Sequence, residues 1–202
     1  MPNKFIEMMK ERRTIYNIDS SLPISQEKLI TLVKEAVKEA PSSFNSQTSR
    51  VVILFGDEHK KLWHNITKET LKEIVAKEIF TTTEKKIDSF AAGAGTILFF
   101  EEQNVIKELQ QKFPLYADNF PVWSEQSSGM AQYAVWASLA QEKVGASLQH
   151  YNPLIDEKVH ASWKIPSSWK LRAQLVFGAI KQQANEKTYI NDDIRFKVFG
   201  EN

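Results

Sequence analysis

The sequence of 202 residues contains no cysteine. Disulfide bonds, thiolate nucleophiles, zinc sites with thiolate ligands and cysteine-held iron–sulfur clusters are therefore excluded. A surplus of basic charge is also absent, since 26 Lys and Arg residues stand against 25 Asp and Glu residues. Proteins that bind nucleic acid or anionic membranes normally carry a concentrated basic excess, so we expect neither partner here.

Long hydrophobic runs are missing as well. The longest, near Val51–Phe55 and Thr96–Phe100, fall far short of the roughly 20 residues that a membrane-spanning helix needs. The N-terminal sequence MPNKFIEMMKERR lacks the apolar region of a signal peptide, so a cytoplasmic protein is expected. No repeat or Pro/Gly/Ser-rich linker divides the chain, and we expect one domain, residues 1–202.

The motifs of several enzyme classes are absent or incomplete. None of the 4 histidines has a metal-ligand spacing, so no metal site is expected. Gly145–Gln149 begins like the G-x-S-x-G motif of serine hydrolases but lacks its second glycine. Gly93–Leu98 lacks the third glycine of a dinucleotide-binding fingerprint, and it precedes a predicted strand instead of following one.

Hydrophobic periodicity predicts helices that alternate with short strands. Between Ser25 and Pro41, apolar residues recur at three- and four-residue steps, which indicates a helix that Ser25 caps and Pro41 ends. We expect helices at 5–13, 26–40, 62–79, 84–92, 105–113, 130–144 and 153–163, and strands at 51–55, 96–100, 146–149, 171–180 and 195–199. Gly145 is expected to end the helix before it. These elements predict an α+β fold in which helices surround a central, mostly antiparallel sheet.

Polar clusters lie at the predicted ends of these elements. Arg12, Arg13 and the Thr14 hydroxyl follow the first helix, and arginine binds phosphate through forked, charge-assisted hydrogen bonds. Cations at that place could equally cap the helix C-terminus. Arg195 and Lys197 fall on one face of the predicted tail strand, as an anion clamp or as part of a solvated tail.

Two further clusters carry few charges. Residues 41–49, PSSFNSQTS, offer hydroxyl and amide groups that suit a heteroaromatic ring or a polyol. A loop that satisfies its own backbone has the same composition, so both readings stay open. Residues 149–153, QHYNP, place an amide and an imidazole at the predicted end of a strand, where they would edge a ligand site or form a turn.

In this order, the clusters resemble the flavin-dependent nitroreductase family, and most closely its small fatty-acid-repression-type subgroup. The resemblance rests on RRTIY at 12–16, PSSFNSQTSRVV at 41–52, GAGTILFFE at 93–101, GASLQHYNPLID at 145–156 and RFKVFG at 195–200. It implies a nitroreductase-like fold and a homodimer in which FMN lies at the interface and is contacted by both chains.

The resemblance also implies roles for individual residues. Arg12, Arg13 and Thr14 would bind the phosphate and ribityl chain of FMN, and Arg195 and Lys197 would complete the phosphate site. Tyr16 stands where many relatives carry a second basic residue. The partner subunit would line the flavin with Pro41, Ser42, Ser43, Asn45 and Gln47. Gln149 and His150 would approach the isoalloxazine ring.

The implied activity is reduction of nitroaromatic or quinone-type acceptors by NADH or NADPH, in a ping-pong hydride transfer through flavin N5. Because the flavin carries this chemistry, no catalytic acid or base is expected from the chain. An apolar wall for flat acceptors, or simple loop packing, is expected from Phe113, Tyr116, Phe120 and Trp123. Two alternatives stay open: a flavin-binding regulatory or sensor protein in lipid or stress signalling with little turnover, and an interaction protein without cofactor.

Overall fold

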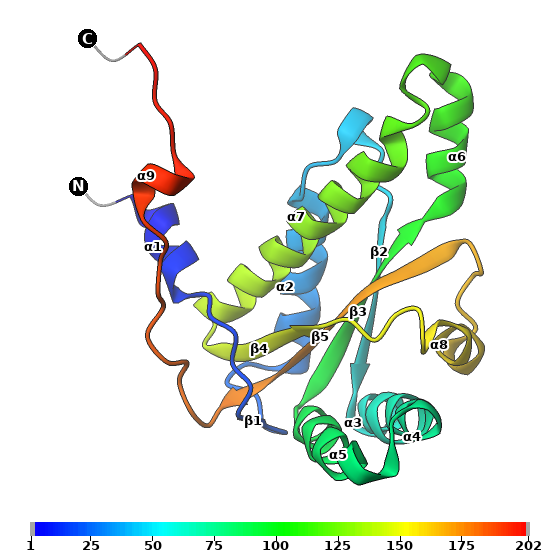
Figure 1. The fold of residues 1–202 in the computed structure, drawn as a ribbon, viewed down its shortest axis with the longest axis vertical. Coiled ribbons are helices and arrows are strands. Elements are labelled where there is room, and N and C mark those ends of the chain that lie inside the picture. Colours follow the sequence, from blue (N-terminus) through cyan, green and yellow to red (C-terminus); the bar gives the residue numbers. More distant parts are fainter. Residues whose placement is uncertain (1–2, 201–202) are drawn as a thin grey trace.

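A five-stranded antiparallel sheet forms the centre of the molecule in a computed structural model that describes residues 3–200 (Figure 1). The long β5 (Trp169–Ile180) pairs with β3 (Gly95–Glu102) on one side and with β4 (Val144–Gln149) on the other. β2 (Ser49–Phe55) extends the sheet beyond β3, and β1 (Ile18–Asp19) pairs with the end of β5. The prediction of an α+β fold with an antiparallel sheet is confirmed.

Helices cover both faces of this sheet, because successive side chains of a strand point to opposite sides. Ile97 and Phe99 of β3 join the core under one helical layer, and Leu98 and Phe100 join the core under the other. The first layer consists of α2 (Gln26–Glu39) and α7 (Asn119–Gln141). The second contains α3 (Gly56–Lys60), a π-helical segment (Lys61–Lys68), α4 (Glu69–Ile74), α5 (Lys77–Ala91) and α8 (Asp156–Trp163).

The remaining elements lie outside these layers. They are α1 (Lys4–Glu11), α6 (Gln103–Lys112), α9 (Asp192–Arg195) and the 3-10 turns Ser43–Asn45 and Pro114–Tyr116. The predicted cap of α2 is confirmed, since Ser25 Oγ accepts the backbone N–H of Lys28 at 3.1 Å.

Two helix predictions were wrong in their bounds. The helix predicted at 130–144 begins at Asn119, because its first turns bury Ser124, Ser127 and Ser128 at helical spacing, and serines give no hydrophobic stripe. The helix predicted at 62–79 is divided where Val75 and Ala76 leave helical geometry between α4 and α5. The segment predicted at 84–92 forms the end of α5.

Gly145 does not end a helix but lies inside β4. The turn after α7 is made at Lys143, whose φ is 58°. A Cβ atom at position 145 would lie 2.8 Å from the Ile180 side chain and 3.0 Å from that of Ile18. Glycine at this position therefore allows close packing of β4 against its neighbours.

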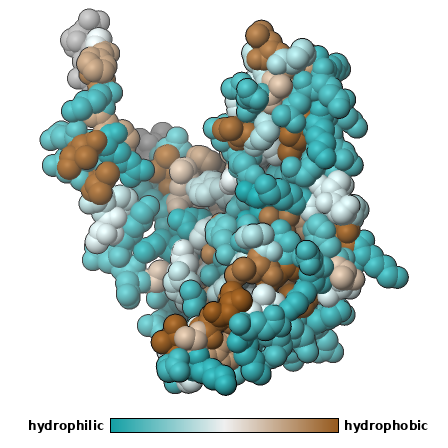
Figure 2. All heavy atoms as spheres, turned by 45° about the vertical axis from the view of Figure 1, so that its right-hand side comes forward, coloured by the Kyte–Doolittle hydropathy of each residue, from teal (hydrophilic) through white to brown (hydrophobic). Residues whose placement is uncertain are grey.

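The strand predicted at 195–199 is not formed. Arg195 ends the short helix α9, and the residues after it have no regular structure. After β5 the chain leaves the sheet and passes beside α1 (Figure 1), where it has no strand edge to pair with. Residues 181–200 form this C-terminal arm, and Figure 2 shows it standing away from the rest of the molecule, with apolar side chains on its surface.

Candidate functional site

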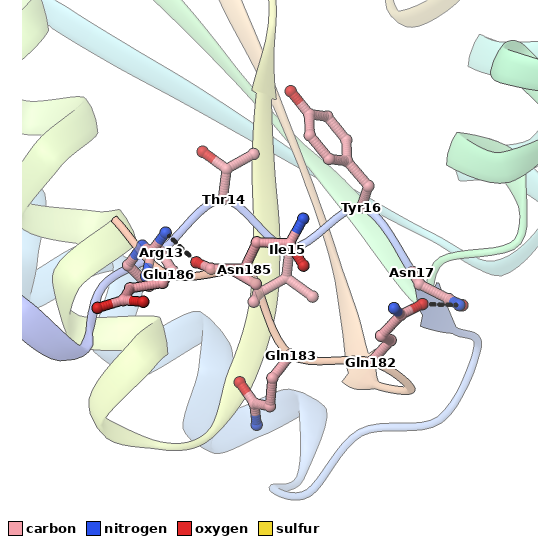
Figure 3. Close-up of a pocket in the computed structure, with 10 residues that line it drawn as sticks. Arg13, Thr14, Ile15, Tyr16, Asn17, Gln182, Gln183, Asn185 and Glu186 are labelled. Atoms are coloured by element: carbon pink, nitrogen blue, oxygen red, sulfur yellow. Dashed lines mark hydrogen bonds between the residues drawn. The ribbon is translucent and has the colours of Figure 1, made fainter. Parts of the chain in front are cut away.

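The chain from Arg12 to Tyr16 is extended and runs alongside β4. Ile15 donates its backbone N–H to the carbonyl of Ala146 at 2.9 Å, next to a parallel bridge between Thr14 and Ala146. Figure 3 shows Thr14 and Tyr16 pointing to one side and Ile15 to the other. The same alternation assigns Arg12 to the Thr14 side and Arg13 to the Ile15 side.

Arg12 lies against α7. The carbon of its guanidinium is 4.5 Å from the centre of the Trp136 ring, a cation–π contact that fixes the position of the charge. Within residues 3–200, the buried indole N–H of Trp136 has no hydrogen-bond partner. A fixed cation beside an unused donor fits a ligand rich in acceptor oxygens, such as a phosphate or a polyol.

Arg13 contacts the C-terminal segment instead. Its Nη2 donates to the carbonyl of Asn185 at 2.6 Å, across a cavity of about 350 Å³ between residues 13–17 and 182–186 (Figure 3). The two guanidinium groups are therefore not directed at the same place. Arg12 packs against Trp136 of α7, and Arg13 holds the start of the C-terminal arm at Asn185.

The predicted flavin loop, residues 41–47, is folded on itself. Ser42 Oγ accepts the backbone N–H of Gln47 at 2.9 Å, and the intervening residues form the 3-10 turn that contains Ser43. Phe44, Asn45 and Gln47 all have positive φ, at 58°, 50° and 48°. Such geometry costs non-glycine residues about 1–3 kcal/mol each and is concentrated at functional sites. Pro41, Asn45 and Gln47 are exposed on the loop surface.

Phe44 joins this loop to the predicted aromatic wall, and sequence analysis did not include it. Its ring centre lies 4.9 Å from that of Phe113, 5.4 Å from Phe120 and 6.1 Å from Trp123. Tyr116 completes the group at 6.2 Å. The four predicted wall residues thus form one aromatic cluster, and 53% of Phe44 remains exposed at its surface. A lone aromatic residue in a polar stretch was the available sequence signal.

At the end of β4, Gln149 is buried and His150 is exposed. Gln149 is the register partner of Gln174 in β5, a residue that sequence analysis missed because it lies in the middle of an apolar strand. The Gln174 side chain accepts the backbone N–H of Tyr151 at 2.7 Å, so it fixes the turn that follows His150.

Arg195 and Lys197 lie on the C-terminal arm and are both exposed. The prediction that they share one face of a strand was wrong, because Arg195 closes a helical turn and Lys197 follows it in an irregular segment. The Arg195 guanidinium lies 5.6 Å from the ring of its neighbour Phe196.

An apolar groove of about 770 Å³ opens between α1, α2 and α7. Small and apolar side chains line it, among them Ala36, Ala40, Ala134 and Ala137. Pro41 lies at the end of this groove and also borders a smaller pocket of about 190 Å³. The loop 41–47 therefore stands at one end of the groove.

Among the described residues 3–200, no three His, Asp or Glu side chains are grouped so that they could hold a metal ion. In the same part of the chain, no helix combines the length and the apolar character needed to cross a membrane.

The antiparallel sheet between two helical layers is the fold of nitroreductases. Nitroreductase CinD from Lactococcus lactis, solved in complex with 4-nitrophenol, has 51% sequence identity and a TM-score of 0.89, over 98% of this chain and 100% of CinD. CinD has also been solved with chloramphenicol and with nicotinic acid. A nitroreductase with bound FMN from Desulfitobacterium hafniense shares the fold at 12% identity, with a TM-score of 0.72 over 99% of this chain and 100% of that one.

The chain belongs to the nitroreductase family. The sequence model described as "Nitroreductase family" matches residues 9–179. Two Saccharomyces cerevisiae proteins, HBN1 and nitroreductase FRM2, are 36% and 32% identical over 192 and 194 residues, which is 94% of this chain and 95% of each relative. The family and these relatives support an oxidoreductase.

Proposed function

We propose that this chain is an FMN-dependent oxidoreductase that passes electrons from NADH or NADPH to nitroaromatic or quinone-type acceptors. The observation that carries the proposal is the Arg12 guanidinium fixed over Trp136, beside the unused indole N–H, in a chain of the nitroreductase family. CinD, at 51% identity, is known with 4-nitrophenol and with nicotinic acid, whose pyridine ring is the ring of nicotinamide.

In this proposal the residues of the chain bind and orient the cofactor. Arg12 and Thr14 hold the phosphate and ribityl end, and the exposed Arg195 and Lys197 of the C-terminal arm add charge to the phosphate site. A buried phosphate needs such pairing, because an unpaired charge is costly away from water. Bound FMN would supply hydride transfer from the nicotinamide to the acceptor through its N5 atom.

The loop 41–47 and the aromatic cluster lie at the other end of α7 from Arg12. Trp123, which contacts Phe44, and Trp136, which contacts Arg12, are 13 residues apart on α7. At the helical rise this separates them by about 20 Å. The separation supports a homodimer in which the loop of one copy lines the flavin held by Arg12 of the other.

The apolar groove supports the same homodimer. It extends along α7 from Gln126 to Ser138, and so it spans the distance from the loop 41–47 to the region of Arg12. At its edge α1 exposes 59% of Phe5 and 37% of Met8. A groove of this kind is unfavourable in water, and we infer that a second copy of the chain covers it.

Absorbance spectroscopy tests the proposal. The purified protein should be yellow, release FMN on denaturation, lose its colour with NADH or NADPH and regain it when 4-nitrophenol or a quinone is added. A flavin that binds but is not reduced would favour the sensor alternative. A colourless protein that does not take up added FMN would contradict the cofactor and favour an interaction protein.

A further inference from the structure

A buried carboxylate lies between the flavin loop and the aromatic cluster, and the proposed function does not use it. Glu101 of β3 is only 1% exposed. Its Oε1 accepts the hydroxyl of Ser49 and its Oε2 accepts the hydroxyl of Ser124, each at 2.6 Å. Ser49 begins β2 as the register partner of Glu101, whereas Ser124 comes from α7. One side chain thus bridges two strands and a helix.

Glu101 lies where the core under α7 changes from apolar to polar. Ile97 and Phe99, on the same face of β3, belong to the apolar core, and Glu101 follows them in the alternation. On α7, Glu101 bonds to the buried Ser124, and the buried residues one turn away are Phe120 on one side and Ser127 and Ser128 on the other. An apolar side chain often serves at least as well for stability as a buried charge. Stability alone is therefore a poor account of a glutamate here.

The two hydroxyl partners connect Glu101 to the loop 41–47 and to the aromatic cluster. Thr48 separates Ser49 from the loop 41–47. The carbonyl of Thr48 accepts the backbone N–H of Glu102 at 2.9 Å, so this part of the chain is held against β3. Ser124 is the neighbour of Trp123, a member of the aromatic cluster. Loop and cluster are thus joined at their outer end by Phe44 and at their base by Glu101.

We propose that Glu101 is a positioning residue that fixes the loop 41–47 relative to the aromatic cluster and so sets the shape of the acceptor site. The inference rests on the proposed function, which assigns the loop to the flavin, and it takes the aromatic cluster as the apolar wall for flat acceptors. Charge-assisted hydrogen bonds of this length are strong and directional, so they hold both serines at fixed places.

Three variants test the inference. Glu101→Leu keeps most of the bulk but accepts no hydrogen bond, whereas Glu101→Gln can still accept from one serine and donate to the other. Glu102→Gln is the matched control, because the neighbouring carboxylate is bonded elsewhere, to the backbone N–H of Asn104 at 3.0 Å and to Ser168 at 3.1 Å.

Steady-state kinetics with 4-nitrophenol and NADH give the first readout. Glu101→Leu should raise the KM for the acceptor by about tenfold, with a much smaller change in kcat, because two strong hydrogen bonds to the site are lost. Glu101→Gln and Glu102→Gln should stay within about twofold of the wild type. A purely structural role would lower the melting temperature of Glu101→Leu and leave the KM of the folded protein unchanged, which would overturn the inference.

Hydrogen exchange gives a second readout that does not depend on turnover. In Glu101→Leu, backbone amides of residues 41–47 and 113–123 should exchange faster together, and Glu101→Gln should restore their protection. Wild-type exchange in both segments of Glu101→Leu would overturn the inference even if the enzyme is active. A wild-type protein without flavin reduction would contradict the proposed function, while the exchange comparison would still decide whether Glu101 couples loop and cluster.

Discussion

Arg12 and Arg13 are adjacent in the chain, yet their guanidinium groups serve different parts of the molecule. Arg12 stacks on Trp136, whereas Arg13 donates to the carbonyl of Asn185. The sequence predicts a cationic segment after α1, because the two adjacent arginines can be read from the sequence itself. It does not predict that the two arginines contact different parts of the molecule. Asn185 is 172 residues from Arg13, and the direction of each side chain depends on the pairing of this segment with β4.

Because Arg13 is bonded to Asn185, Arg12 is the better of the two arginines for a test of cofactor binding. We expect Arg12→Ala to weaken FMN binding by about 10- to 150-fold, the loss of a charge-assisted phosphate contact of about 1.5–3 kcal/mol. Quenching of FMN fluorescence during titration of the flavin-free protein measures this Kd.

Lys10→Ala is the control for that measurement. Lys10 is also a cation of the same region, but it is exposed on α1 and paired with Glu7 at 2.9 Å. It should leave the Kd unchanged. If Arg12→Ala also binds FMN as the wild type does, Arg12 does not contact the phosphate.

At the level of elements, the sequence predicted best where the pattern is local. The strands β2, β3 and β5 were found because each contains a continuous apolar run, which is buried on both faces of the sheet in β3 and β5 and mostly half-buried in β2. β1 escaped notice, because two residues become a strand only by pairing with β5. The loop around Phe44 was recognised as a polar surface, but its contact with the aromatic cluster depends on where α7 begins.

Helix α3 carries a buried polar group, His59. His59 is 1% exposed, and its Nδ1 lies 2.8 Å from the Thr96 hydroxyl oxygen, which also accepts the indole N–H of Trp63 at 2.8 Å. Burial lowers the pKa of His59 from 6.5 to about 4. The folded state therefore holds this imidazole neutral at pH values where the unfolded chain protonates it.

This pKa shift predicts how stability depends on pH. Because the unfolded chain binds the additional proton below about pH 6.5, the free energy of unfolding should fall as the pH is lowered from 6.5 toward 4. His59 should account for a loss of about 2–3 kcal/mol between pH 7 and pH 4.5. Urea unfolding at both pH values measures the loss.

His59→Gln separates this contribution from that of other groups. The variant should be less stable at pH 7, because the buried site is disturbed, but it should lose less stability than the wild type on acidification. Equal losses in both proteins would show that His59 does not titrate in this range.

At the scale of the whole molecule, the two halves of the proposed site belong to opposite ends of α7. Composition and periodicity say nothing about oligomeric state, and the homodimer was implied only by the family resemblance. The structure adds a physical reason, because the apolar groove lies between the loop 41–47 and Arg12. Covering the groove with a second copy would bury apolar surface and bring the unlike halves together.

A single charge in this groove tests the arrangement. Ala137 lines the groove on α7, and Ala137→Glu would place a carboxylate in a surface that the partner must desolvate. We expect the variant to sediment as a monomer and to lose bound FMN together with the dimer. Gln111→Glu adds the same charge at an exposed position of α6 and should leave the dimer and its FMN content unchanged.

Circular dichroism shows whether Ala137→Glu is folded. A folded monomer that keeps its full FMN content would contradict a site shared between two chains, and an intact dimer would contradict the groove as its interface.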